Sequence, residues 1–456
     1  MQDILVIFTR SPMPGKVKTR LIPKLDAYGA ARLQRDMALH VINTGRGLMQ
    51  DMDVEIHYDG EDQASIRHLA GGDIPVKHQA EGDLGQRMFN SFCCMFERNY
   101  KRMVLIGSDC PLITIQTLRQ SFDMLGSYDC VLGPARDGGY YLIGLKQPNK
   151  DLFTDIFWGG SRVFAETIAR AESNGLAAAR LETLPDIDRP EDITIWKELY
   201  CRETPSISVI IPILNEAGTI VETLKHLQGG ENIEPIVVDG GSKDQGPALA
   251  SKHGACVIQA DPGRANQMNA GAQHAAGEIL LFLHADTLLP KGFDHYIRQS
   301  LADPRNIAGA FGLRFDKNSF TLNIIETGAN LRSRHLQLPY GDQGIFLRRA
   351  DFQTLGGFPE VPVMEDFAFM QALKKQGTIV TLPQKIITSA RRFEVLGVIN
   401  TWLINQCVIM SYLKGADPVK IAGLYRSQKG ITRWLGFLCG IFRDKRNKRK
   451  VKQIPM

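Results

Sequence analysis

The sequence predicts a protein of two α/β domains, because two long stretches each alternate apolar strands with helical patterns. Its 456 residues exceed what one ordinary hydrophobic core encloses. Apolar strands separated by helices are typical of a mostly parallel sheet that is covered on both faces. The short polar segment 200–206, YCRETPS, contains Pro205, and we expect the domain boundary there.

In the first domain, residues 1–200, apolar runs bounded by turn-forming residues predict strands at 4–8, 53–58, 75–79, 103–106, 130–133 and 140–145. Helical patterns lie between them at 26–48, 83–98, 114–125 and 161–173. The second domain, residues 207–395, begins with the same rhythm and predicts strands at 207–213, 236–238, 279–283 and 344–347. A helical run follows at 367–375. We therefore expect one shared fold, without a residue-by-residue repeat.

A helical extension is expected at 396–442, followed by a basic tail at 443–456. The stretch 396–413 is largely apolar but marginal for a spanning helix, which needs about 20 residues. It reads as packed domain helices, as a membrane-surface anchor beside the apolar run 431–442, or as a span. The tail carries a net charge of +6, against +5 for the whole chain, so the rest is near −1 and has no surplus of positive charge for nucleic acid. It is either solvated or attracted to anionic lipid.

The composition is that of a globular protein, with 44% hydrophobic and 23% charged residues. The eight cysteines are scattered without metal-finger spacing, and a disulfide scaffold does not fit so large a chain. The chain begins directly with a strand-like run and shows no signal-peptide pattern. A cytoplasmic location is predicted, at the inner face of the membrane if the extension and tail bind lipid.

Polar side chains follow the predicted strands of the second domain where each strand ends. Ligands of open α/β sheets bind at the carboxyl ends of the strands. The order of these groups predicts a site for a nucleotide, a divalent metal and a catalytic base that serves sugar transfer. The groups are Asn215 and Glu216, Asp239 with Gly240 through Asp244, His284 with Asp286, and Glu365 with Asp366.

The strings SVIIPILNEAGTIVETL and IVVDGGSKD resemble the family-two inverting glycosyltransferases. GRANQMNAGAQHAAGEILLFLHADTLLP and PVMEDFAF extend the resemblance from 207 to about 392. It implies a GT-A, nucleotide-diphospho-sugar transferase fold and a UDP- or GDP-linked sugar donor. Within this family the chain looks most like the arsenosugar-biosynthesis branch, which implies a small or lipid-like acceptor.

By this resemblance, four residues contact the base and ribose, and Arg264 supplies a cation near the diphosphate. The four are Asn215, Glu216, Asp239 and Asp244. Glycines at 240 and 241 allow the backbone to approach a ligand closely, because they lack Cβ. The alternatives are a tight turn with a helix cap for these loops, and plain solvation for Arg264.

The growing negative charge of a diphosphate leaving group calls for Mg²⁺ or Mn²⁺, and Asp286 is the natural carboxylate ligand. The family usually has Asp-x-Asp here, whereas this chain has His284-Ala285-Asp286. With the first carboxylate missing, the metal would bind together with the nucleotide phosphates. His284 is either a ligand or a packed residue at the strand end.

Direct displacement needs a base for the acceptor hydroxyl, and Asp366 matches the family's base, with Glu365 orienting it or the acceptor. The alternative is an acidic first helical turn that complements the helix dipole. Asp342 and Gln343 are expected on the acceptor side. Arg391 and Arg392 stand where processive relatives carry Gln-x-x-Arg-Trp, and this departure favours addition of a single sugar.

In the first domain, FTRSPMPGKVKTRL, EGDLGQRM, IGSDCPLIT, GPARDGGYYLIGL and LPDIDRPEDI resemble the uncharacterised DUF2064 type, allied to nucleotidyltransferases. A cationic loop could bind phosphates through Arg10, Lys16, Lys18 and Arg20. Asp109 and Asp188 could hold Mg²⁺, and 137–140 could shape a pocket. The alternatives are a solvated basic loop, a helix cap at Asp109, and turn residues at Asp186 and Asp188.

These patterns together predict an inverting, metal-dependent glycosyltransferase fused to a nucleotidyltransferase-like domain. One alternative is that only the second domain is catalytic, while the first binds nucleotide or regulates. A different class is a membrane-peripheral scaffold that binds nucleotide without turnover.

Overall fold

The computed structural model describes residues 2–426 and 434, and the chain divides into two compact units. The first unit is Met1–Leu199 and the second is Tyr200–Met456. The predicted run 431–442, apart from Trp434, and the basic tail 443–456 lie outside the described residues.

The first unit is built on a seven-stranded sheet of order β3-β2-β1-β4-β6-β5-β7. β1, β2, β3 and β4 run parallel, whereas β6 lies antiparallel between β4 and β5. The parallel neighbours β1 and β4 therefore end at the same edge. The strands are β1 (Asp3–Arg10), β2 (Asp53–Asp59), β3 (Val76–His78), β4 (Arg102–Gly107), β5 (Cys130–Pro134), β6 (Tyr140–Leu145) and β7 (Ala178–Arg180).

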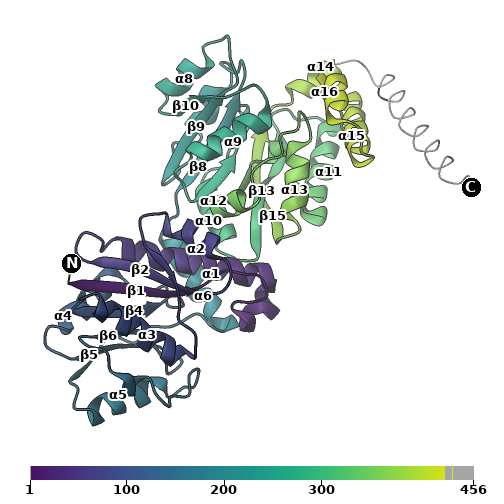
Figure 1. Ribbon diagram of the computed structural model, residues 1–456. Helices are drawn as coiled ribbons and strands as arrows, with labels where there is room; N and C mark the ends of the chain where they lie inside the picture. The colour runs from purple at the N-terminus through teal and green to yellow at the C-terminus, as the bar shows by residue number, and fades with distance from the viewer. Residues whose placement is uncertain (1, 427–433, 435–456) are drawn as a thin grey trace, which may run out of the picture. The chain divides into compact units, whose positions relative to one another are not determined.

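Helices cover both faces of this sheet (Figure 1). Alternate residues of β1 enter different cores: Leu5 packs with α1, α2 and α4, whereas Ile4 packs with α3 and α5. Two buried faces explain why the strands are continuously apolar. The helices are α1 (Ile22–Arg46), α2 (Gln63–Ala70), α3 (Leu84–Glu97), α4 (Ile115–Met124), α5 (Val163–Ser173) and α6 (Ile193–Arg202).

The second unit has an eight-stranded sheet of order β10-β9-β8-β11-β14-β13-β15-β12. β10, β9, β8 and β11 are parallel, and β14 pairs antiparallel with both β11 and β13. The strands are β8 (Ile207–Ile213), β9 (Ile233–Asp239), β10 (Cys256–Gln259), β11 (Ile279–Phe282), β12 (Thr287–Leu288), β13 (Asn306–Phe315), β14 (Ile345–Arg348) and β15 (Thr378–Thr388).

One face of the second sheet packs on α9, α12 and α13 through a shared apolar core. Gly271 lets α9 approach closely, because a Cβ there would lie 2.4 Å from the Ile210 side chain. The helices are α7 (Ile220–Lys225), α8 (Gly246–Lys252), α9 (Arg264–His274), α10 (Phe293–Leu301), α11 (Phe320–Leu336), α12 (Arg349–Thr354) and α13 (Glu365–Leu373).

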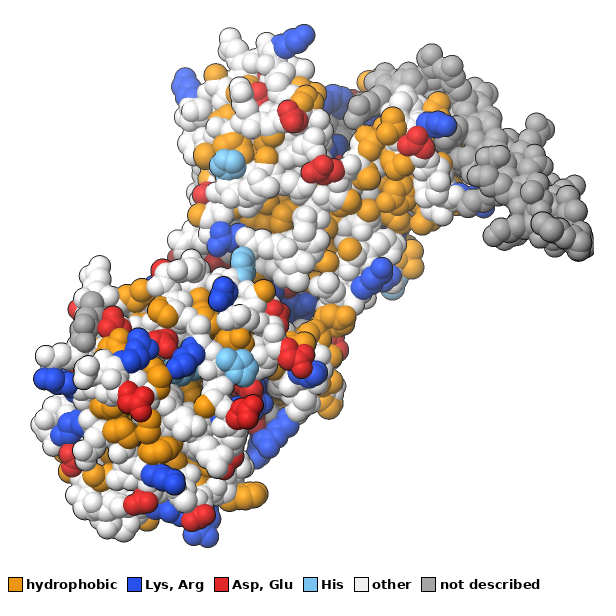
Figure 2. Space-filling model, viewed as in Figure 1, with side chains coloured by type: hydrophobic (Ala, Val, Ile, Leu, Met, Phe, Trp, Pro, Cys, Tyr) orange, Lys and Arg blue, Asp and Glu red, His pale blue; other side chains and the backbone are white. Residues whose placement is uncertain are grey.

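Three further helices follow the sheet: α14 (Arg391–Leu396), α15 (Val398–Leu413) and α16 (Pro418–Arg426). One face of α15 packs on the start of α13, where the rings of Tyr412 and Phe367 lie 6.0 Å apart. Its other face exposes Ile399 and Trp402, and Figure 2 shows hydrophobic side chains on the surface of this part. None of the described helices is long and apolar enough to cross a membrane. Within 396–413, one face of α15 thus packs on the second unit, as the packed-helix alternative predicts, while the other face is exposed.

The predicted α/β class, with two Rossmann-like sheets and a helical C-terminal portion, is confirmed. Both sheets are mixed, however, because antiparallel strands such as β6 and β14 enter them. Strand periodicity does not reveal direction, since parallel and antiparallel strands buried on both faces read alike.

Candidate active site

The predicted site residues of the second unit gather at one edge of its sheet. β8, β9 and β11 are parallel neighbours, so their carboxyl ends meet there. Asn215 follows β8, Asp239 ends β9, and Asp286 comes shortly after β11. The topology therefore brings together groups that are separated by about 70 residues of chain, as expected at the ligand-binding edge of an α/β sheet.

Hydrogen bonds join the loops after β8 and β9. Asn215 Oδ1 accepts from the backbone N–H of Lys243 at 2.8 Å, and Asp244 Oδ2 accepts from that of Ala217 at 2.9 Å. Asp239 is buried, and its Oδ1 accepts from the backbone N–H of Ser242 at 2.9 Å. These bonds agree with the turn-and-cap reading, and contact with a nucleotide stays a prediction.

The negative charge of Asp286 is only partly compensated by its neighbours. Burial raises its pKa, and the charge of Glu216 adds to this effect, while Arg391 and Arg264 oppose it. Arg391 Nη2 lies 3.1 Å from Glu216 Oε1. A divalent cation would relieve the repulsion between Asp286 and Glu216, so the donor set fits a hard metal ion. Among the described residues no three such ligands gather, and nucleotide phosphates would complete the shell.

The predicted base lies in the first turn of α13. Asp366 Oδ1 accepts from the backbone N–H of Phe367 at 2.7 Å, and its Oδ2 accepts from that of Gly341 at 2.9 Å. Glu365 is buried, and its Oε1 lies 3.7 Å from Arg264 Nη1. Two backbone donors hold the Asp366 carboxylate in one orientation, and they tie α13 to the loop before β14.

His284 lies in the interior of the second unit, next to the cavity that Asp366 lines. Burial, followed by the charge of Arg264, lowers the pKa of His284 to about 3, so the ring is neutral. Its Nε2 has no hydrogen-bond partner among the described residues and faces a cavity of about 10 Å³ shared with Arg264, Gly341 and Asp366. This interior position agrees with the packed reading of His284. The missing first carboxylate of the Asp-x-Asp pattern is thus replaced by an uncharged group.

Two residues predicted for the acceptor side have other partners. Gln343 is fully buried, and its amide bonds to Ser333, Arg332 and the backbone carbonyl of Phe311. Arg392 bonds to the Tyr425 hydroxyl, and its guanidinium lies 3.9 Å from the centre of the Tyr425 ring. The Gln343 side chain is therefore committed to the fold, whereas an acceptor role for the partly exposed Arg392 stays a prediction. Burial raises the pKa of Asp342, beside Asp366, and its acceptor role stays a prediction.

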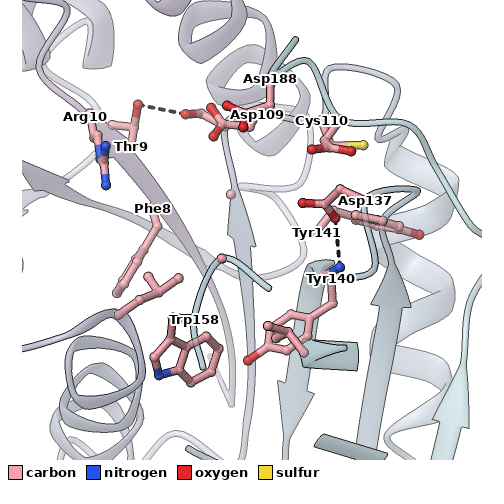
Figure 3. Close-up of a pocket in the computed structure, with 18 of the residues that line it drawn as sticks. Phe8, Thr9, Arg10, Asp109, Cys110, Asp137, Tyr140, Tyr141, Trp158 and Asp188 are labelled. Atoms are coloured by element: carbon pink, nitrogen blue, oxygen red, sulfur yellow. Dashed lines mark hydrogen bonds between the residues drawn. The ribbon is translucent and has the colours of Figure 1, made fainter. Parts of the chain in front are cut away.

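The first unit holds a cavity of about 520 Å³ at the carboxyl ends of β1 and β4. In Figure 3, the rings of Phe8, Tyr140 and Trp158 lie at one end, and Asp109 and Asp188 lie at the other. Aromatic faces suit sugars or bases, and polar groups fix orientation in such pockets. No motif in the sequence marked Trp158, because a single aromatic residue is usually part of the core.

The structure brings Asp109 and Asp188 together, but around Lys18. Lys18 Nζ lies 3.0 Å from Asp109 Oδ1 and 3.8 Å from Asp188 Oδ1. Arg20 pairs with the second carboxylate oxygen of Asp188. The predicted Mg²⁺ site between these aspartates therefore does not fit the residues present. Arg10, Lys18 and Arg20 line the cavity, whereas the exposed Lys16 is outside its lining, contrary to the expected phosphate-binding role.

A turn was the alternative reading for Asp186 and Asp188, and the structure places Asp186 in the lining of this cavity. Burial raises its pKa to about 6, and the charges of Asp137, Asp188 and Asp192 add to the effect. A signal was present in Asp186-Ile187-Asp188: Ile187 is fully buried, and the alternation of an extended segment turns both aspartates away from it.

The geometry agrees with the relatives of this chain. Residues 208–355 match the family described as glycosyl transferase family 2. This matching segment lies within the second unit. Residues 46–160 match DUF2064, described as an uncharacterized protein conserved in bacteria.

Known proteins similar to this chain include glycosyltransferases. An uncharacterized glycosyltransferase of Mycobacterium tuberculosis is 38% identical over 88 residues, 18% of this chain and 34% of that protein. Glucosyl-3-phosphoglycerate synthase of Mycolicibacterium smegmatis is 33% identical over 97 residues, 19% of this chain and 32% of that protein. A putative nucleotide-diphospho-sugar transferase from Desulfovibrio desulfuricans has a solved structure. It is 30% identical, with a TM-score of 0.40, over 44% of this chain and 86% of its own. This chain thus spans about a third of the length of each of the two curated relatives.

Proposed function

We propose that the second unit transfers a sugar from a nucleotide-sugar to an acceptor hydroxyl with inversion at the anomeric carbon. The observation that carries this proposal is Asp366, held by the backbone N–H groups of Gly341 and Phe367 beside Arg264. A carboxylate fixed in this way can accept the hydroxyl proton as the acceptor oxygen attacks.

The cations near Asp366 suit the donor. Arg264, half exposed at the start of α9, can face the diphosphate, since its Nη1 lies 3.7 Å from Glu365 Oε1 and it lines the same small cavity as Asp366. The N-terminus of α9 adds backbone N–H groups that favour anions. Asn215, Glu216, Asp239 and Asp244 then shape the site for the base and ribose of a UDP- or GDP-linked donor.

Asp286 and Glu216 would hold Mg²⁺ or Mn²⁺ together with the donor phosphates. When bound, such an ion neutralises charge that develops on the leaving diphosphate. Arg391, paired with Glu216, keeps that carboxylate at the edge of the site until a donor binds.

For the first unit, the cavity of about 520 Å³ favours binding of a nucleotide or nucleotide-sugar. Arg10 and Arg20 line it and can contact phosphate, while Trp158 and Tyr140 offer rings for stacking. This proposal has two versions. In one, the first unit catalyses nucleotidyl transfer; in the other, it binds the nucleotide only to regulate the second unit.

The acceptor is proposed to be a small or lipid-like molecule, as in the arsenosugar-type branch that the sequence resembles. The exposed apolar residues Val395, Ile399 and Trp402 support contact of the C-terminal helices with an anionic membrane surface at the cytoplasmic side. Flotation of the full chain with vesicles that contain anionic lipid tests this contact, and failure to float at low salt contradicts it.

The decisive experiment measures donor hydrolysis by the full chain over a panel of UDP- and GDP-sugars with Mn²⁺ or EDTA. We expect one donor class to be cleaved with Mn²⁺, with little activity in EDTA, and the stereochemistry of the transferred sugar to be inverted. Asp286→Ala should remove the metal stimulation. Cleavage that is equal in EDTA, or a retained anomeric configuration, contradicts the proposed mechanism.

A further inference from the structure

The ammonium group of Lys18 lies between the two carboxylates, Asp109 and Asp188, that the sequence predicts as Mg²⁺ ligands in the first unit. Its Nζ lies 3.0 Å from Asp109 Oδ1 and 3.8 Å from Asp188 Oδ1, and it donates to the backbone carbonyl of Ile187 at 2.6 Å. The side chain is only 3% exposed. Three oxygens on two separate segments thus surround one buried positive charge.

Two cationic side chains already balance the charges of Asp109 and Asp188. Arg20 pairs with the other carboxylate oxygen of Asp188, so two aspartates face two cationic side chains. A divalent ion is attracted to a site by uncompensated carboxylate charge. To bind here, Mg²⁺ would have to expel a buried ammonium group, and it would leave that group without its partners.

The backbone of the loop is shaped to deliver Lys18. Lys18 has φ of 47°, the left-handed region that a residue with a side chain rarely adopts. Val17 next to it is buried, and the Lys18 carbonyl accepts from the backbone N–H of Leu21 at 2.8 Å, which starts the short helix before α1. Such a conformation persists only where surrounding contacts hold it. The Lys18 position is therefore part of the fold.

We propose that Lys18 is a built-in replacement for a divalent cation, and that the first unit holds its ligand without a metal ion at Asp109 and Asp188. The fixed ammonium keeps both carboxylates neutralised at the end of the cavity. Phosphate groups can then approach this end without meeting two bare negative charges. The two units thus differ in metal use, although each carries aspartates after its strands.

The test counts Mn²⁺ bound to the full chain by the loss of the free-ion electron paramagnetic resonance signal. An Asp286→Ala background removes the ligand proposed for the second unit. In that background, the chain with Lys18 should bind no Mn²⁺ that depends on Asp109. Lys18→Met should gain one bound Mn²⁺, because Asp109 and Asp188 are then left without their ammonium partner.

Matched controls separate charge from folding. Lys18→Arg keeps the cation and Lys24→Met removes an exposed one, and neither should gain a Mn²⁺. Thermal unfolding supplies a second readout: Lys18→Met should lower the midpoint, and Mn²⁺ should restore it in this variant alone.

Two results overturn the proposal. One is that the chain with Lys18 binds a Mn²⁺ which Asp109→Asn abolishes, since the ion then displaces the lysine. The other is that Lys18→Met, folded by circular dichroism, gains neither Mn²⁺ nor thermal rescue. Because the readout is metal binding in the first unit, failure here leaves sugar transfer by the second unit untouched.

Discussion

Each unit places an aspartate after a parallel strand, Asp109 after β4 and Asp286 after β11, yet the two units compensate these charges in different ways. In the first unit Lys18 and Arg20 pair with Asp109 and Asp188. In the second unit Asp286 has a raised pKa beside Glu216, whose partner Arg391 is largely exposed. The ends of the strands determine where the carboxylates lie. Cationic side chains from other segments, such as Lys18 and Arg391, determine how far the carboxylate charge is compensated.

The surroundings of the reacting groups differ as well. The first unit has a wide cavity with aromatic rings at one end, and in the second unit a cavity of about 10 Å³ borders His284, Gly341 and Asp366. The first therefore has room for a whole ligand in the free chain. The second has a carboxylate, Asp366, that two backbone N–H groups already hold in one orientation.

The largest expected effect is a loss of sugar transfer on replacement of the proposed base in the second unit. Asp366→Asn should lower sugar transfer by about 10²- to 10⁴-fold, because the amide cannot accept the acceptor proton. Donor binding, measured by calorimetry, should persist. Glu222→Gln makes the same chemical change at an exposed position of α7 and should transfer normally. Retained transfer in Asp366→Asn would show that another group is the base.

A smaller loss should follow from crowding the base. A Cβ on Gly341 would lie 3.1 Å from His284 Nε2 and 3.4 Å from Asp366 Oδ2. Gly341→Ala should therefore displace Asp366 and lower kcat by about 10- to 100-fold. Gly229→Ala adds the same methyl group where nothing lies within 4 Å, and kcat should not change. An unaltered kcat in Gly341→Ala would mean that this contact does not position the base.

Replacing Asp186 with Asn should raise the free energy of unfolding by about 1 kcal/mol at pH 8, a value reduced to allow for the partial exposure of Asp186. Its folded pKa of about 6 exceeds the ordinary value of 3.8, so its ionisation costs stability as pH rises between these values. Asp186→Asn should therefore stabilise the chain at pH 8 but not at pH 3, as measured by urea unfolding.

The control for this prediction is Asp151→Asn, a change at an exposed position. It should leave the urea midpoint unaltered at both pH values. If Asp186→Asn destabilises the chain at pH 8, the Asp186 carboxylate makes favourable contacts that outweigh its burial.

The smallest expected effect has the same sign in the second unit. The pKa of Asp286 is raised, so its charged form is disfavoured in the fold and stability falls as pH rises through this range. Asp286→Asn should raise the thermal midpoint at pH 8, with the gain fading in acid, while Mn²⁺ stimulation is lost. Asp261→Asn, a change at an exposed position, should alter neither the thermal midpoint nor the Mn²⁺ stimulation. A lower thermal midpoint in Asp286→Asn would contradict the expected repulsion between Asp286 and Glu216.

Much of the fold was predictable, because buried strands leave plain apolar runs. The predicted strands 207–213 and 140–145 coincide with β8 and β6, and the helix 83–98 brackets α3, which begins with a capping box at Asp83. Short elements such as α2 and β7 were missed, since they carry too few periodic residues. The antiparallel direction of β6 was also outside the reach of periodicity.

For the sites, the sequence located the strand-end residues but not their partners. The His284-Ala285-Asp286 departure and the helix start at Glu365 and Asp366 could be read from the chain. Gln343 and Arg392 were placed on the acceptor side, but they bond to Ser333 and Tyr425 instead. Partners that are distant in sequence leave no local pattern.

The sequence by itself determined the α/β class, the family-two segment and the aspartates that follow the strands, because these depend on local periodicity and contiguous motifs. Only the tertiary structure decided that Lys18 lies between Asp109 and Asp188, and that Asp286 lies beside Glu216. The physical reason is that charge compensation depends on distances between segments far apart in the chain. Those distances are fixed by the order of the strands and by the packing of helices on the sheet.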